Sequence, residues 1–194
     1  MLLPTFQRPS VPSIREFLDR QARLPLTYAA TGTLTGEPPP GYRANRARAR
    51  LGRGAPAFDA ARSALLGWEQ FPRGWVELCF PDVPIEPGRV VAVLSRGLGV
   101  WWLNACRIVS VVDEEGPGAC FGFAYATLPG HVATGEERFL VEWDRGDDAV
   151  WYDILAFSRP NHVLTRLGYP LVRRLQKRFG RDSAAAMRRA VRSP

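Results

Sequence analysis

The side chains in this sequence that could do chemistry form one dense polar cluster: Tyr125, Thr127, His131, Glu136, Glu137 and Arg138, joined by Ser158 and Arg159 at the end of the last predicted strand. His131 lies in a Pro-Gly loop, and loops carry binding and catalytic side chains disproportionately. Paired with Glu137 and oriented by Tyr125, this histidine would be a general acid or base. One interpretation is therefore a cyclase-, isomerase- or hydrolase-like enzyme in which His131, Glu137 and Tyr125 are the catalytic candidates.

The same cluster has two interpretations without catalysis. Glu137 shares a strand face with Phe139, so an inward face would put its carboxyl group near the rim of an apolar interior. A carboxylate there must pair or take up a proton, and Arg159 or Arg107 is the partner that we expect. The cluster is then a polar anchor at the mouth of a ligand cavity, or a structural ion pair that holds strand ends together.

Further side chains are candidates for contact with a ligand. Trp101 and Trp102 are adjacent in a predicted strand and therefore point to opposite faces. Asn104 shares the face of Trp102 and would determine specificity if that face is inward, although core packing is the alternative for these aromatic residues. The predicted ligand-binding residues are Trp102, Asn104, Tyr125, Thr127, Phe139, Arg159, Leu175 and Phe179.

Several kinds of chemistry lack their usual patterns. The chain has two histidines, His131 and His162, and no HExxH spacing, so we expect no metal and no cofactor. The RGLG and LGRG stretches are not phosphate loops, and no GxSxG elbow occurs. Cys79, Cys106 and Cys120 show no CxxC spacing, and we expect all three to be small core residues.

Charge is distributed unevenly along the chain. The net charge is +7, with nine arginines against three acidic residues over 1–53, eight against fifteen over 54–165, and nine basic residues against one acidic residue over 166–194. The basic C-terminal segment is either a solvated surface or a contact for anionic lipid. The candidate contacts are Arg173, Arg174, Lys177, Arg178 and Arg181. Nucleic acid is a third alternative for this surface, but few aromatic residues interleave with these side chains, so we expect no specific nucleic acid partner.

Composition and length indicate a globular chain. Apolar residues make up 46% of the 194 residues and charged residues 23%, which is typical of one folded domain. No apolar run reaches the roughly 18 residues that span a bilayer, and the first residues do not resemble a signal peptide. We therefore expect a cytoplasmic protein without a transmembrane segment.

The first part of the chain predicts two helices and a strand. Ser13 and Glu16 have capping-box spacing, and one helical face follows before Pro25: Ile14, Phe17, Gln21 and Leu24. The range 31–41 is a Gly/Pro-rich loop. The alternating range 42–51 indicates a strand, and a second helix follows Pro56 with its apolar face at Phe58, Ala61, Leu65 and Trp68.

From Gly74 onward, apolar residues recur at every second position, as they do in strands. Strands are predicted over 75–80, 89–95, 100–112, 119–127, 136–143 and 149–158, and the short turns between them favour antiparallel pairing. A long helix follows Pro160. Its apolar stripe is Val172, Leu175, Phe179, Ser183, Ala186 and Ala190, and its arginines lie mostly opposite.

This order of elements predicts an α+β fold of the helix-grip type, in which a curved seven-stranded antiparallel sheet surrounds a long C-terminal helix. We expect a single domain over 1–194, with an N-terminal helix and loop over 1–41 and the helix-grip core over 42–194. The interior under the last helix would then bind a small hydrophobic or lipid-like ligand. The enzyme interpretation and binding to an anionic surface remain the alternatives.

Four stretches also resemble a known family: RLGRGAPAFDAARSALLGW, NACRIV, GFAYATLPGHVATGEERF and AFSRPNHVLTRLGYPLVRRLQKRF. They are similar to the bacterial and plant family called domain of unknown function 1990, from about Tyr28 to Val191. The resemblance implies a helix-grip (START/Bet v 1-like) fold, a group that includes lipid-transfer domains, pollen-allergen-like carriers and polyketide cyclases. It implies a bacterial source but no established activity and no catalytic residues.

Overall fold

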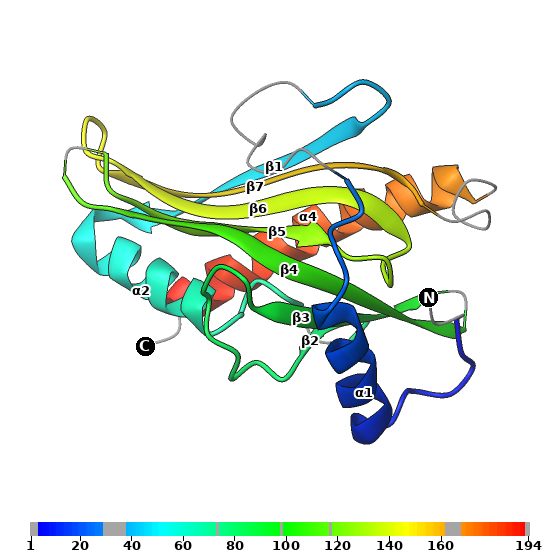
Figure 1. The fold of residues 1–194 in the computed structure, drawn as a ribbon. Helices are drawn as coiled ribbons and strands as arrows, with labels where there is room; N and C mark the ends of the chain where they lie inside the picture. The colour runs from blue at the N-terminus through cyan, green and yellow to red at the C-terminus, as the bar shows by residue number, and fades with distance from the viewer. Residues whose placement is uncertain are drawn as a thin grey trace.

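Seven antiparallel strands form the sheet of this protein. The computed structural model describes residues 4–28, 38–72, 74–97, 99–116, 118–161 and 168–192, and most of the loop predicted over 31–41 lies outside them. The strands are β1 (Arg43–Arg53), β2 (Val76–Cys79), β3 (Val90–Gly97), β4 (Val100–Glu114), β5 (Cys120–Thr127), β6 (Ala133–Asp144) and β7 (Ala149–Pro160). Their order is β1-β7-β6-β5-β4-β3-β2, so the first strand pairs with the last (Figure 1).

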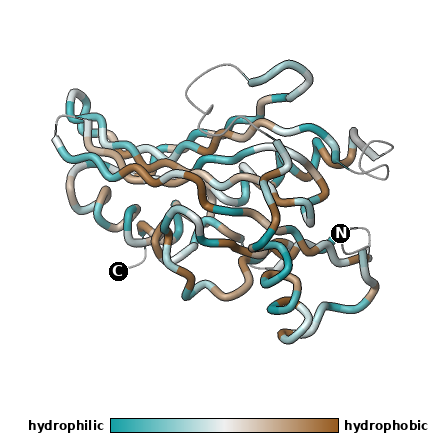
Figure 2. The backbone as a smooth tube through the Cα atoms, viewed as in Figure 1, coloured by the Kyte–Doolittle hydropathy of each residue, from teal (hydrophilic) through white to brown (hydrophobic). Residues whose placement is uncertain are grey.

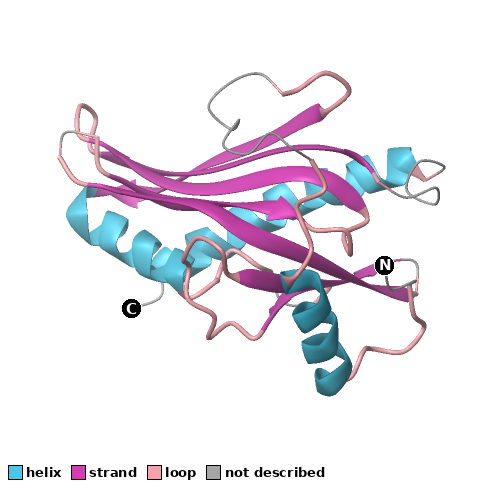
Figure 3. Cartoon of the chain, in the orientation of Figure 1, coloured by secondary structure: helices cyan, strands magenta, loops and turns pink. Residues whose placement is uncertain are grey.

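Two helices cover one side of this sheet. The helices α2 (Gly54–Leu66) and α4 (Tyr169–Arg192) lie together on the side that we call the inner face, and α4 runs along the strands (Figure 3). The opposite side is the outer face, and α1 (Val11–Ala22) packs there against β3 and β4. A curled seven-stranded sheet around a long C-terminal helix confirms the helix-grip prediction.

The first helix begins earlier than its sequence pattern indicated. Ser10, not Ser13, is the N-cap, and its Oγ accepts a hydrogen bond from the Ser13 N–H at 3.3 Å. Pro12 fits this first turn because its missing N–H would have no partner there. The predicted capping role of Glu16 was therefore wrong, and this carboxylate pairs with Arg20 one turn later. Ile14, Phe17 and Gln21 are buried as predicted, whereas Leu24 lies beyond the helix.

Aromatic rings fill the core between the inner face and the two helices. Phe123 and Phe139 on neighbouring strands have ring centroids 5.2 Å apart, and Trp68 lies 4.9 Å from Phe123. Phe71 and Phe179 stack on the other side of this group, 5.7 Å apart. Figure 2 shows the hydrophobic positions concentrated along the central strands that carry these rings. Burying such a side chain stabilises a fold by roughly 1.5–3 kcal/mol.

The last helix packs closely only over its second half. Ser183, Ala186 and Met187 are buried, and a Cβ atom at Gly180 would lie 3.0 Å from the Ala47 Cβ on β1. Small side chains let the helix axis approach the sheet here. Over the first half, larger side chains such as Leu175 are only partly buried. The helix therefore grips the sheet at its C-terminal end and leaves space beneath its N-terminal end.

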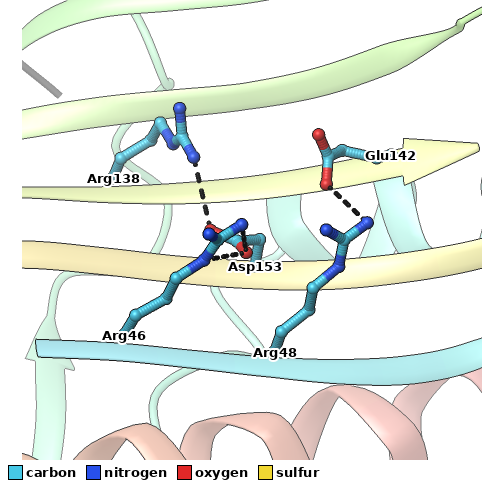
Figure 4. A network of polar contacts seen from close by, with 5 residues as sticks. All are labelled: Arg46, Arg48, Arg138, Glu142 and Asp153. Atoms are coloured by element: carbon cyan, nitrogen blue, oxygen red, sulfur yellow. Dashed lines mark hydrogen bonds and ion pairs between the residues drawn. The ribbon is translucent and has the colours of Figure 1, made fainter. Parts of the chain in front are cut away.

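A network of charged residues lies on the outer face (Figure 4). Asp153 on β7 is fully buried and accepts a hydrogen bond from Arg46 Nε on β1 at 2.7 Å. Arg138 on β6 lies 3.3 Å from the other carboxylate oxygen. Arg48 pairs with Glu142 beside this group at 3.2 Å. The network connects three adjacent strands on the side that α2 and α4 do not cover.

Two further sequence predictions concern the burial of the three cysteines and the expected lack of a transmembrane segment. Cys106 is fully buried, while Cys79 and Cys120 are half-buried, and all three are free thiols, so the expectation of three core cysteines holds fully only for Cys106. No helix within the described residues is long and apolar enough to cross a membrane.

Candidate ligand cavity

A cavity of about 520 Å³ lies beneath the first half of α4. Its walls come from the inner face of β3 to β7, from α4, and from the loop between β5 and β6. Most of the lining is apolar, and the apolar side chains that α4, the strands and the β5–β6 loop supply include Val93, Trp102, Val132, Leu171, Leu175 and Phe179. The space is large enough for a small organic molecule, since ligand pockets commonly measure roughly 300–1,000 Å³.

Two polar side chains meet on the sheet wall of this cavity. Tyr125 on β5 and Glu137 on β6 are direct cross-strand neighbours, and both line the cavity. The Tyr125 hydroxyl donates a hydrogen bond to Glu137 Oε2 at 2.5 Å. The predicted strand faces were thus inward, and they bring a phenol and a carboxyl group together where a ligand would lie.

Burial changes the acidity of both groups. Removal from bulk water raises the pKa of Glu137 from 4.5 to about 7, although the hydrogen bond from Tyr125 opposes this shift. Burial, and next the nearby Glu137 charge, raise the pKa of the Tyr125 hydroxyl well above 10. A carboxylate that sits in an apolar cavity without a cation favours its neutral form. Near neutral pH, Glu137 therefore exchanges between its acid and its carboxylate.

The predicted arginine partner of Glu137 was wrong. Arg159 lies with its guanidinium 4.8 Å from the Tyr42 ring centroid. Arg107 donates hydrogen bonds to the carbonyl oxygens of Ala22 and Leu24, at 2.8 and 3.0 Å. Side chains along a strand point alternately to the two faces of the sheet, and at these two positions they point to the outer face. The partner of Glu137 is the phenol of Tyr125 instead.

His131 lines the same cavity from the loop between β5 and β6. Its Nδ1 lies 2.9 Å from the Ala133 backbone nitrogen and 3.0 Å from the Ala133 carbonyl oxygen, so the backbone holds the ring in place. Burial lowers the pKa of His131 to about 4, so the ring is neutral at physiological pH. No hydrogen bond joins His131 to Glu137 in the part of the chain that the structure describes. The catalytic roles of these residues remain predictions.

The other predicted contact residues divide into two groups. Thr127, Trp102, Leu175 and Phe179 line the cavity together with Tyr125. The second group comprises Asn104, Phe139 and Arg159, which the structure places elsewhere.

Asn104 and Phe139 support the cavity from behind. Asn104 Oδ1 accepts a hydrogen bond from the Val132 N–H at 3.3 Å, and its Nδ2 donates to the Val93 carbonyl at 3.5 Å. The amide thus fixes the β5–β6 loop to β3. Phe139 is fully buried beneath Tyr125, with ring centroids 5.4 Å apart, and belongs to the aromatic core.

The sequence patterns placed Ser158 in the polar cluster but missed the polar rim through which it joins α4 to the sheet. Gln176 on α4 donates from Nε2 to Ser158 Oγ on β7 at 2.9 Å. Asn45 on β1 donates from Nδ2 to the Gln176 carbonyl at 3.4 Å. All three residues line the cavity. Asn45 was detectable as the one uncharged polar residue within an Arg-Ala strand, but its partner on α4 was not.

Space for a ligand comes from small residues beside Glu137. Ala156 on β7 is the cross-strand neighbour of Glu137, and Gly135 lies two positions earlier on β6; both line the cavity. A Cβ atom at Gly135 would lie 2.0 Å from the Phe157 carbonyl oxygen, so a larger residue cannot occupy that position without moving the strand. Within the described residues, no cluster of three or more His, Cys, Asp or Glu could hold a metal ion.

Comparison with known proteins gives relatives in sequence and distant likenesses among solved structures. A UPF0548 protein of Dictyostelium discoideum is 40% identical over 157 residues, which cover 77% of this chain and 73% of the relative. A UPF0548 protein of Deinococcus radiodurans is 37% identical over 197 residues, with 95% and 97% covered. The crystal structure of human STARD10 aligns with a TM-score of 0.46 at 12% identity, covering 95% of this chain and 80% of that one.

The relatives include a eukaryotic and a bacterial protein, so similarity to them does not fix the bacterial source that we expected. Residues 27–186 match the family described as Domain of unknown function (DUF1990). This range contains the whole sheet and the cavity walls on β3 to β7. The match also covers the four stretches that suggested the resemblance. With most of its length matched and with relatives of 37–40% identity, the chain belongs to the DUF1990 family.

Proposed function

We propose that this protein binds a small, mostly apolar molecule of the lipid-like class in the cavity between the sheet and α4. The observation that carries the proposal is the cavity itself: about 520 Å³ of space with apolar walls and one buried carboxyl–phenol pair. Protein interiors are close-packed and rarely contain voids larger than a water molecule. A space of this size beside a close-packed aromatic core is therefore best explained by a ligand.

The packing of α4 supports this interpretation. Gly180 and Ser183 bring the second half of the helix close to the sheet. Over the first half, Leu175 and Phe179 line the space without filling it. Apolar walls and a few convergent polar groups are the usual composition of a small-molecule site.

A variant that fills the cavity tests the proposal. Ala156→Phe places a ring next to Glu137, and we expect it to weaken binding of the neutral fluorescent probe N-phenyl-1-naphthylamine by about tenfold or more, which is about 1.4 kcal/mol. The matched control is Ala44→Phe, at an exposed position on the neighbouring strand β1, and it should leave the affinity unchanged. Fluorescence titration measures both.

Two results would contradict the proposal. The wild-type protein could fail to bind the probe at all, or the two phenylalanine variants could bind it equally well. Native mass spectrometry of protein purified without detergent gives an independent measurement, because a ligand carried from the cell adds its mass to the folded chain and should be lost from Ala156→Phe.

The exposed face of α4 supports a second role, contact with an anionic membrane surface. Arg174, Lys177, Arg178 and Arg181 are exposed on the first half of the helix and at its middle. Arg173 and Arg178 also have partners within the protein. Arg173 donates to Gln176 Oε1 at 3.1 Å and to the Ala44 carbonyl, and Arg178 donates to Asp182 Oδ2 at 3.2 Å. Basic side chains near an anionic bilayer contribute about 1 kcal/mol each. A membrane contact on this face would bring the covering helix next to the lipid that the cavity accepts.

Vesicle binding tests this second role. We expect the protein to sediment with phosphatidylserine vesicles at low salt and to be released as salt is raised. The double variant Lys177→Glu with Arg181→Glu should abolish the association while it leaves binding of N-phenyl-1-naphthylamine intact. Equal sedimentation with phosphatidylcholine vesicles, or binding to DNA instead of vesicles, would contradict a contact with anionic lipid.

A further inference from the structure

The polar end of the cavity has a defined position between an apolar floor and a polar rim. Tyr125 and Glu137 pair across β5 and β6, with Ala156 beside them on β7. Below the pair, the Phe139 ring lies 5.4 Å from that of Tyr125 and closes the floor. A ligand with one polar group would therefore place that group against Glu137 and its apolar part against the walls.

At this position the protein offers a hydrogen-bond acceptor. The proton of the Tyr125 hydroxyl already goes to Glu137 Oε2. Glu137 makes no other hydrogen bond in the part of the chain that the structure describes, so the acceptor capacity of its carboxyl group remains for a ligand. Each amide of the rim already engages one N–H within the protein, since Asn45 donates to the Gln176 carbonyl on α4 and Gln176 donates to Ser158 on β7.

The charges around the cavity also favour a ligand group that donates a hydrogen bond. The ionisable residues among the described lining are Tyr125, His131, Glu136 and Glu137, and the lining contains no lysine or arginine within these residues. Glu136 accepts from the Tyr28 hydroxyl. His131 is neutral because burial lowers its pKa to about 4. Beneath the wall, burial and Glu137 both raise the pKa of the Cys106 thiol, which leaves it neutral as well. Glu137 thus sets the sign of the local potential.

We infer that the cavity selects apolar ligands whose polar end donates a hydrogen bond and carries no negative charge, with Glu137 as the residue that determines this selectivity. This inference rests on the proposed function. An alcohol or a protonated amine donates a hydrogen bond to the carboxylate, and the amine adds an opposite charge. A carboxylate ligand would meet a like charge between mostly apolar walls, where the two charges repel more strongly than in water. Such an anion can bind only after Glu137 takes up a proton.

Three ligands with the same aromatic skeleton separate these cases: 1-naphthalenemethanol, 1-naphthylmethylamine and 1-naphthoate. At about pH 8 the amine is protonated and the acid is ionised. Isothermal titration calorimetry should show the alcohol and the amine binding about tenfold or more tightly than 1-naphthoate. Tightest binding of 1-naphthoate would overturn the inference.

A glutamine variant assigns the selectivity to one residue. Glu137→Gln keeps the shape of the side chain and removes its charge, so the preference should fall to within about threefold. The matched control is Glu142→Gln, which makes the same change on the same strand but in the outer-face pair with Arg48. A preference that persists in Glu137→Gln would overturn the assignment to this residue, as would a preference lost in Glu142→Gln alone.

Wild-type protein supplies a second measurement that needs no variant. Because burial raises the pKa of Glu137 to about 7, binding of 1-naphthoate at about pH 8 should take up nearly one proton. The heat of binding then depends on the ionisation enthalpy of the buffer, whereas the heat for the alcohol does not. Binding of 1-naphthoate without proton uptake overturns the inference. Failure of all three ligands and of N-phenyl-1-naphthylamine to bind refutes the proposed function instead.

Discussion

Asp153 on the outer face and Glu137 on the inner face are two carboxyl groups of one sheet, and their surroundings are opposite in character. On the outer face, Asp153 accepts hydrogen bonds from Arg46 and lies 3.3 Å from Arg138, so two cations compensate its charge. On the inner face, Glu137 has a phenol as its partner, and its pKa is raised to about 7. Asp153 and Glu137 lie on the neighbouring strands β7 and β6, within one sheet and a few residues of each other in register.

This difference indicates a structural role for Asp153 and supports the proposed ligand contact of Glu137. A buried carboxylate that two arginines surround has its hydrogen-bonding capacity filled, and the ion pairs connect β1, β6 and β7. A carboxyl group that only one neutral hydroxyl touches keeps acceptor capacity and lies beside an open space. Perturbed acidity of this kind, together with a cavity, indicates a binding site more often than a structural contact. Breaking each group in turn should therefore affect different properties.

Asp153→Ala should have the largest effect on stability. It leaves Arg46 and the partly buried Arg138 without their shared partner, and removal of one member of a buried ion pair typically costs about 3–5 kcal/mol. Because the Arg46 side chain is 55% exposed and can regain water, we expect a loss near the lower end, about 3 kcal/mol. Urea unfolding followed by circular dichroism measures the change.

Asp153→Asn is the control for this prediction. It keeps the size and one acceptor oxygen, so its loss of stability should be smaller, and its affinity for N-phenyl-1-naphthylamine should equal that of the wild type. If Asp153→Ala unfolds at the wild-type urea concentration, the network in Figure 4 is a surface contact without structural consequence.

Sequence patterns predicted the fold well because the spacing of hydrophobic residues and the turn residues between elements are properties of short stretches of sequence. The alternation of Phe139 and Val141 with charged residues marked β6, and both residues are fully buried. Arginine spacing marked the exposed side of α4. The helix start was misplaced because Ser10 and Ser13 both precede an apolar face, and only the position of Pro12 in the first turn separates them.

The site was predicted only in part because the sequence pattern of one strand does not determine which residues of the neighbouring strand lie opposite it. Tyr125 and Glu137 were expected on inward faces, but their direct pairing depends on the length and path of the β5–β6 loop. The Arg159 error has the same origin, since a shift of one residue moves a side chain to the other face. Contacts between Gln176 and Asn45 depend on the placement of α4, which no local pattern specifies.

The pH dependence of stability should distinguish the inner-face carboxyl group. Its folded pKa is about 7 against an ordinary 4.5, so the folded state holds a proton that the unfolded state releases between these values. Stability from Glu137 is therefore present at low pH and is lost as pH rises from about 4.5 to 7, by about 3 kcal/mol at most. Glu137→Gln does not titrate and should lack this dependence.

The measurement is the difference in unfolding free energy between wild type and Glu137→Gln across this range. Taking the difference matters because His131 contributes the opposite slope: its lowered pKa of about 4 means that stability is lost as pH falls from 6.5 to about 4. The wild type alone can therefore show a nearly flat profile. A difference that stays constant with pH, or that grows in favour of the wild type as pH rises, would contradict the raised pKa.

Tyr125→Phe should have the smallest effect on stability and a specific effect on acidity. Loss of the hydroxyl removes one hydrogen bond, which costs about 1 kcal/mol, and more at high pH where Glu137 is charged. Because that bond favours the carboxylate, its loss should raise the Glu137 pKa above 7, as carbon-13 NMR of the carboxyl group can follow.

The control is Tyr152→Phe, which removes the 2.8 Å hydrogen bond between a buried phenol and Ser183. That variant should lose similar stability at every pH. An unchanged Glu137 titration in Tyr125→Phe would mean that the cavity wall, and not the phenol, determines how readily this carboxyl group ionises.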